Sequence, residues 1–111
     1  MILGHFAALR GGRNDQAKSF LDDAAARCDK YVWPYPVVEY LRGESKQAKL
    51  LAAATDNDKM TEVRCFLGLD LIQKKEKDSA LAHFRWVKEH GNPRSVEYTI
   101  ALAELDRLIN K

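Results

Sequence analysis

Apolar side chains recur at steps of three and four residues through most of the chain, with polar side chains between them. This spacing places the apolar residues on one face of a helix, and no segment alternates convincingly as a strand does. Clusters of Gly, Asn, Asp and Pro separate the periodic segments and predict turns. We therefore expect seven helices, at about residues 2–10, 14–28, 34–42, 45–54, 59–74, 78–90 and 94–110.

The chain also carries an internal repeat, marked by Ala17, Ala48 and Ala80, which stand 31 and 32 residues apart. Five residues before each alanine lies a turn position, and four residues after it lies a residue on the same helical face. The turn positions are Gly12, Gly43 and Lys75, and the later positions are Leu21, Ala52 and Phe84. A period near 32 residues predicts stacked helical hairpins.

Residues near the ends of the periodic segments predict where the helices begin and stop. Asp58 and Asn92 can each accept a hydrogen bond from the N–H groups of a first helical turn. Pro93 fits a first helical position, where its missing N–H costs nothing. Gly91 follows His90 at the end of a helical pattern, which favours a left-handed backbone at the glycine.

The third unit, residues 61–94, resembles the tetratricopeptide repeat (TPR). The positions that match this family in register are Leu67, Gly68, Leu71, Ala80 and Phe84 in the third unit, Gly43 and Ala48 in the second, and Gly12, Ala17, Leu21 and Ala24 in the first. Arg64 departs from it, since the family usually has Trp there. The resemblance implies an all-α, right-handed α-solenoid of about three TPR-like hairpins, in units of about 1–28, 29–58 and 61–94, with a capping helix at 94–110.

Small residues have a physical role in such a unit. Gly68 lets the first helix approach its neighbour, and Ala80 fits the crossing point where a larger side chain would separate the helices. Phe84 then fills the space one turn later. The final helix is expected to close the stack, because its apolar residues gather on one side and charged residues keep the other side wet.

In the TPR family, the first helices of successive units line a concave groove that holds a peptide. The resemblance implies that this groove is lined here by Phe6, Leu9, Arg10, Trp33, Val37, Tyr40, Leu41, Cys65, Leu69, Ile72 and Gln73. The strip is apolar, and only Arg10 suits the clamp by which some family members hold a terminal carboxylate. Two interpretations of Trp33 and Tyr40 stay open: they anchor a partner, or they fill the space between the first two units.

Composition places the chain among ordinary globular domains. Its 111 residues are 46% hydrophobic and 31% charged, which excludes disordered and collagen-like classes, and no uninterrupted apolar run of membrane-spanning length exists. The net charge is +2 with both signs mixed, so neither nucleic acid nor membrane insertion is expected. The densest basic run, residues 74–78, is interrupted by acids and is interpreted as a solvated turn.

No constellation of residues predicts catalysis, a metal or another cofactor. The three histidines are scattered, and neither Cys28 nor Cys65 has a partner at zinc-site spacing. Both cysteines are expected to act as small buried hydrophobes in a reducing compartment, with a disulfide left open. A cytoplasmic location is the default, and an exported parent protein stays open because bacterial lipoproteins carry similar repeats.

The sequence therefore predicts a non-catalytic scaffold that binds a peptide or protein segment, chiefly by apolar and aromatic contacts. The alternative is an assembly element, either the end of a longer array or a homo-oligomer, with no peptide ligand. The apolar start without a cap is typical of a segment cut from a longer array, and favours this alternative.

Overall fold

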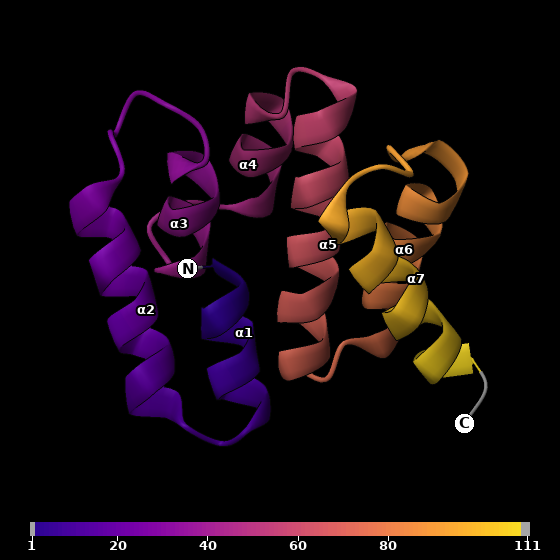
Figure 1. Cartoon of the computed structure of the whole chain (residues 1–111), viewed down its shortest axis with the longest axis horizontal. Coiled ribbons are helices and arrows are strands. Elements are labelled where there is room, and N and C mark those ends of the chain that lie inside the picture. Colours follow the sequence, from indigo (N-terminus) through magenta and orange to yellow (C-terminus); the bar gives the residue numbers. More distant parts are fainter. Residues whose placement is uncertain (1, 110–111) are drawn as a thin grey trace. The chain divides into compact units, whose positions relative to one another are not determined.

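The computed structural model describes residues 2–109, which form seven helices and contain no strand. The helices are α1 (Ile2–Arg10), α2 (Asn14–Arg27), α3 (Tyr35–Leu41), α4 (Gln47–Ala53), α5 (Asn57–Gln73), α6 (Lys77–His90) and α7 (Val96–Ile109) (Figure 1). The predicted all-α class is confirmed, and each expected helix is present with its ends shifted by two residues at most. The chain divides into two compact units, Met1–Leu50 and Leu51–Lys111.

In the first unit α1 packs against α2, and α2 packs against α3. Ala8, Ala17 and Ala24 are almost fully buried, which lets the α1 and α2 backbones approach closely. Val37 and Val38 contribute two fully buried side chains from α3. Both α3 and α4 have seven residues, and an ion pair of 3.0 Å joins Lys49 Nζ of α4 to Glu39 of α3.

In the second unit α5 and α6 form a closely packed pair, and α7 packs against both of them. Ala80, Phe84 and Val87 of α6 are fully buried, as the helical spacing predicted for the first two. The ring of Phe84 lies against Gly68 of α5, which confirms the expected close approach of the two helices. Ala101 and Leu105 form the buried side of α7.

The three predicted turn positions share one backbone geometry. Gly12, Gly43 and Lys75 have φ of +76°, +81° and +62°, in the left-handed region. At each of them the N–H bonds to the carbonyl three residues earlier, and the next N–H bonds to the carbonyl five residues before itself, with N···O distances of 2.8–3.0 Å. This pair of hydrogen bonds satisfies the last carbonyls of the preceding helix. The turns that end α1, α3 and α5 are therefore equivalent.

Two predicted helix ends are wrong in detail. The first turn of α5 is capped by Asp56, whose Oδ1 accepts from Lys59 N–H at 2.8 Å, and not by Asp58. Gly91 is extended, with φ −73° and ψ 170°, rather than left-handed. A glycine is needed there for space, because a Cβ would lie 2.6 Å from the carbonyl oxygen of Val87.

The turn after Gly91 is held by side chains of α5 rather than by the start of a helix. Thr61 Oγ1 accepts from Asn92 N–H at 3.0 Å and donates to Asn57 O at 2.8 Å. Asn92 Oδ1 accepts from Arg94 N–H at 3.0 Å. Helix α7 begins only at Val96, so the expected cap at Asn92 and the expected first helical position of Pro93 are also wrong.

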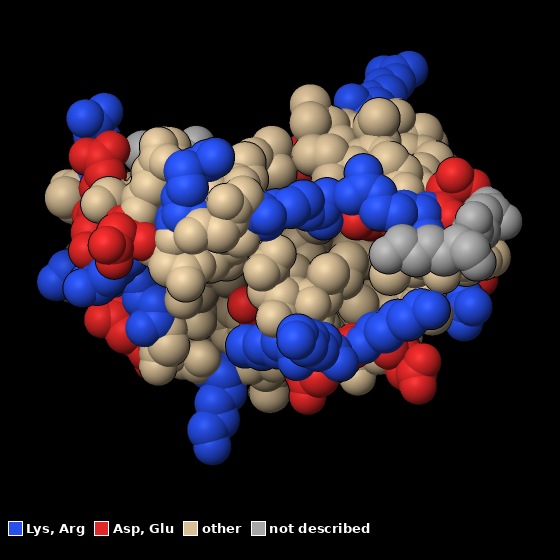
Figure 2. Space-filling view, turned by 90° about the horizontal axis from the view of Figure 1, so that it is seen from below, with Lys and Arg blue, Asp and Glu red and all other residues tan. Residues whose placement is uncertain are grey.

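On the face that Figure 2 shows, Lys and Arg side chains lie beside Asp and Glu side chains at several places. Several are paired within one helix, such as Arg27 with Asp23 at 3.1 Å and Lys74 with Asp70 at 2.9 Å. Across residues 2–109 no helix combines the length and the apolar character that a membrane crossing requires.

Candidate functional site

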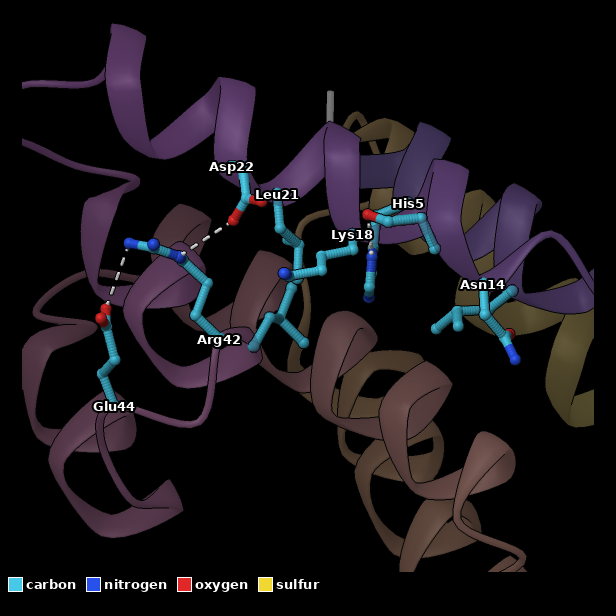
Figure 3. A pocket seen from close by; sticks show the side chains of 10 residues that line it. His5, Asn14, Lys18, Leu21, Asp22, Arg42 and Glu44 are labelled. Carbon is cyan, nitrogen blue, oxygen red and sulfur yellow. Dashed lines mark hydrogen bonds and ion pairs between the residues drawn. The ribbon is translucent and has the colours of Figure 1, made fainter.

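A pocket of about 370 Å³ opens in the first unit between α1, α2 and the end of α3 (Figure 3). Its volume lies in the range of small-ligand and side-chain pockets. It is lined by His5, Leu9, Asn14, Ala17, Lys18, Leu21, Asp22, Leu41, Arg42 and Glu44. We call it the α1–α2 pocket.

The walls of the α1–α2 pocket are apolar. Leu21 and Ala17 are buried on α2, and Leu9 and Leu41 are half-buried at the ends of α1 and α3. The period of the α-helix explains why these side chains face the same pocket. Leu21 lies one helical turn after Ala17 on α2, and Leu9 lies one turn after His5 on α1. A ligand side chain that entered the pocket would therefore exchange water for aliphatic surface.

His5 supplies a polar group to the interior of the pocket. Its side chain is 7% exposed, and its Nδ1 lies 2.9 Å from the carbonyl oxygen of Ala17. A carbonyl can only accept, so Nδ1 carries the proton, and in this Nδ1–H tautomer Nε2 is an acceptor. Nε2 has no hydrogen-bond partner within the described chain. Figure 3 shows the ring pointing into the pocket between Lys18 and Asn14.

Charged side chains surround the opening of the pocket. Arg42 lies between two carboxylates, with Nε 3.6 Å from Asp22 and Nη1 3.4 Å from Glu44. Lys18 differs from it, because its ammonium group has no ion-pair partner among residues 2–109. The opening thus carries Arg42, which is paired with two carboxylates, and Lys18, which has no ion-pair partner in the described chain.

A second polar cluster lies between α5 and α6. The guanidinium carbon of Arg64 lies 5.2 Å from the ring centre of Trp86, and Nη1 lies 3.3 Å from Nδ1 of His83. Burial lowers the pKa of Arg64. Burial and, second, the charge of Arg64 lower the pKa of His83 to about 4, so His83 is neutral near pH 7. Arg64 Nε is buried and has no hydrogen-bond partner in the part of the chain that the structure describes.

The residues predicted for a groove have different environments. Phe6, Val37, Cys65 and Leu69 are buried, so their side chains contribute to packing in this structure. Ile72 is half-buried, and Arg10 and Gln73 are exposed. Of the wider strip, Leu9 and Leu41 line the α1–α2 pocket.

The burial of Cys65 has an identifiable cause in the second unit. Helix α7 packs against α5, and burial followed by the negative charges of Glu97 and Glu104 on α7 raises the pKa of the Cys65 thiol. This face of α5 is therefore covered by α7. Both cysteines are free thiols, with Cys65 buried and Cys28 half-buried, so the expected burial holds fully for Cys65 only.

Trp33 and Tyr40, for which two interpretations were open, are both half-buried. Each of the two residues takes part in an interaction within the chain, so neither is free of contacts. A half-buried aromatic ring also leaves surface that a partner can contact. The two residues therefore fit both interpretations.

The polar residues of the α1–α2 pocket were not among the predicted site residues. One signal in the sequence marks part of the set: Asn14, Lys18 and Asp22 follow one another at four-residue steps and so share one face of α2. Arg42 and Glu44 give no comparable signal, because they reach the pocket through the path of the chain after α3.

In the described part of the chain, no three His, Cys, Asp or Glu residues are grouped so as to hold a metal ion.

No protein-family model matches the chain, and no solved structure matches it.

Proposed function

We propose that the chain is a non-catalytic protein-interaction module that binds a peptide or protein segment, and that the α1–α2 pocket receives one side chain of that segment. The observation that carries the proposal is the pocket itself, which combines aliphatic walls, one acceptor in the interior and a charged opening. Binding sites for side chains and small ligands have this composition, with few polar groups fixing the orientation.

We also propose that the helices belong to a right-handed solenoid of TPR-like hairpins. The support is the repeated turn at Gly12, Gly43 and Lys75, which has the same hydrogen bonds each time. Solenoids of this kind present extended surfaces to partner segments.

Selection from a displayed library of random peptides tests the proposal. Enriched peptides are measured against the purified chain and against Asn14→Trp, which places a large ring at the pocket from an exposed position. We expect this variant to bind at least about tenfold more weakly, since it fills the space that the ligand needs. Ser19→Trp is the matched control, because Ser19 is also exposed on α2 but does not line the pocket.

Each outcome of the selection has a definite meaning. Circular dichroism must show equal helicity in the two variants before their affinities are compared. If Asn14→Trp binds the selected peptides as tightly as the parent chain, the pocket is not the binding site. If the library yields no binder at all, the peptide-binding proposal is wrong.

The second candidate function is an assembly element, and exposed apolar residues on α7 favour it. Val96 is 61% exposed and Ile109 is 54% exposed, at opposite ends of this helix. Covering either side chain with another helix or another copy of the chain would remove its apolar surface from water, which is favourable. Light scattering over a range of concentrations separates the two functions: a stable dimer whose dissociation follows Val96→Glu would support assembly, whereas a monomer supports the receptor.

A further inference from the structure

We propose that the α1–α2 pocket selects an aromatic side chain that carries a hydrogen-bond donor, a tyrosine or a tryptophan of the partner segment. This inference rests on the proposed peptide-binding function and names the chemistry of the group that enters. Three features of the pocket lead to it: its aliphatic walls, the acceptor of His5 and the ammonium group of Lys18, which has no ion-pair partner among residues 2–109.

The walls favour a large apolar group. Leu9, Leu21 and Leu41 present branched aliphatic side chains to a space of about 370 Å³. An aromatic ring offers a large area to such walls and has few rotatable bonds, so it loses little conformational entropy on binding. The shape and composition of the pocket therefore suit a ring.

His5 adds a requirement for a donor. The hydrogen bond from Nδ1 to Ala17 O fixes the tautomer, and Nε2 is left as an acceptor inside a largely buried site. A purely apolar ligand would displace water from Nε2 and leave it unpaired, which opposes binding. A tyrosine O–H or a tryptophan N–H would donate to Nε2 and avoid this loss.

The charges at the opening favour a ring over an anion. Lys18 has no carboxylate partner in the described chain, and a cation close to the face of an aromatic ring is attracted to it. An anionic ligand would meet Asp22 and Glu44, which lie at the same opening and already engage Arg42. A neutral ring with a donor would contact the Lys18 ammonium group through its face and donate a hydrogen bond to His5. It carries no negative charge, so Asp22 and Glu44 would not repel it.

Nuclear magnetic resonance of the whole chain tests the inference with small neutral probes. The probes are N-acetyl-tyrosinamide, N-acetyl-tryptophanamide, N-acetyl-phenylalaninamide and N-acetyl-leucinamide, with sodium acetate as the anionic probe. We expect the tyrosine or the tryptophan probe to shift the His5 Nε2 resonance and to bind about five- to tenfold more tightly than the phenylalanine probe, which has the ring without the donor.

Variants of Lys18 test the role of the cation without disturbing the core, because this residue is exposed. Lys18→Met should weaken the tyrosine and phenylalanine probes alike, and Lys18→Arg should keep their affinities. Lys30→Met is the matched control, since Lys30 is an exposed lysine that does not line the pocket.

Several results would overturn the inference. Equal affinities for the phenylalanine and tyrosine probes would show that no donor is selected, and tighter binding of leucinamide would exclude the ring. An acetate-induced shift at His5 without one from the aromatic probes would assign the pocket to anions. No shift of His5 by any probe also refutes the aromatic selection, whereas the peptide-binding function itself is judged separately by the library-selected peptides and Asn14→Trp.

Discussion

The ring of Phe84 lies against the backbone of Gly68, so close that a Cβ on this glycine would fall within 2.9 Å of three ring carbons. Phe84 is fully buried, so its ring has little freedom to move away. The absence of a side chain at position 68 is therefore a condition for the packing of α5 on α6.

Gly68→Ala is expected to destabilise the chain by about 1 to 3 kcal/mol through overpacking, despite the gain of about 1 kcal/mol that alanine gives a helix interior. Urea unfolding followed by circular dichroism measures the change. Gly4→Ala in α1 is the matched control, because its Cβ would meet only the half-buried ring of Phe20 at 3.0 Å. Gly68→Ala unfolding at a higher urea concentration than Gly4→Ala would contradict the proposed close contact.

Lys75→Gly is expected to stabilise the chain by about 0.5 to 1 kcal/mol. Lys75 has φ of +62°. This left-handed conformation is unfavourable for a residue that has a Cβ, whereas glycine adopts it at almost no energetic cost. The gain is partly offset because glycine has more freedom in the unfolded chain. Thermal and urea unfolding measure it, and Gly12→Ala should show the reverse effect because Gly12 has φ of +76° and open space around its Cα. A destabilised Lys75→Gly would refute the backbone argument.

The apolar spacing and the turn residues made the helices predictable from the sequence, and the repeat added the turn at Lys75. The spacing of Ala17, Ala48 and Ala80 identified Lys75 as the equivalent of Gly12 and Gly43, although its side chain gives no sign of a left-handed turn. Helical periods and turn residues act over a few positions, so they can be recognised in one sequence. This is why the helix boundaries were predicted more accurately than the site.

The candidate site depends on contacts between distant segments, and a single sequence does not show them. The pairing of Asp22 with Arg42 follows from the packing of α3 on α2, and the burial of Cys65 follows from the position of α7. The apolar pattern shows that Val37 and Cys65 could line a groove or lie in a core. Which of the two applies depends on whether other helices cover them, and the sequence does not show this. The reason for a glycine at position 91 was also not predictable from the sequence. A Cβ there would collide with the carbonyl oxygen of Val87, and only the structure shows this contact.

Thr61→Val is expected to destabilise the second unit by about 1 to 3 kcal/mol, because the part-buried Asn92 N–H loses its acceptor, the hydroxyl of the buried Thr61. Valine has nearly the shape of threonine, so packing changes little. Hydrogen exchange of the Asn92 amide should become faster in this variant. Thr61→Ser keeps the hydroxyl group and should keep the slow exchange, and equal exchange rates in both variants would show that the hydroxyl does not hold this turn.

Acid is expected to weaken the fold through His83. Its folded pKa of about 4 lies below the ordinary value of 6.5, so the unfolded chain binds the proton more readily. The free energy of unfolding should be unaffected by His83 above pH 6.5 and should fall by up to about 3 kcal/mol as the pH drops to about 4. Urea unfolding at a series of pH values measures this loss.

His83→Gln separates this effect from the other titrating groups, because the difference between the parent and variant profiles contains only the histidine. Glu97 acts in the opposite direction, since burial raises its pKa and its contribution to stability is lost as the pH rises. Arg64→Gln removes the second cause of the His83 shift, so its His83 pKa should rise but stay below 6.5, because burial is the larger cause. Titration of the His83 ring resonance measures this pKa directly, and a value near 6.5 in the parent chain would show that the ring is not buried beside Arg64.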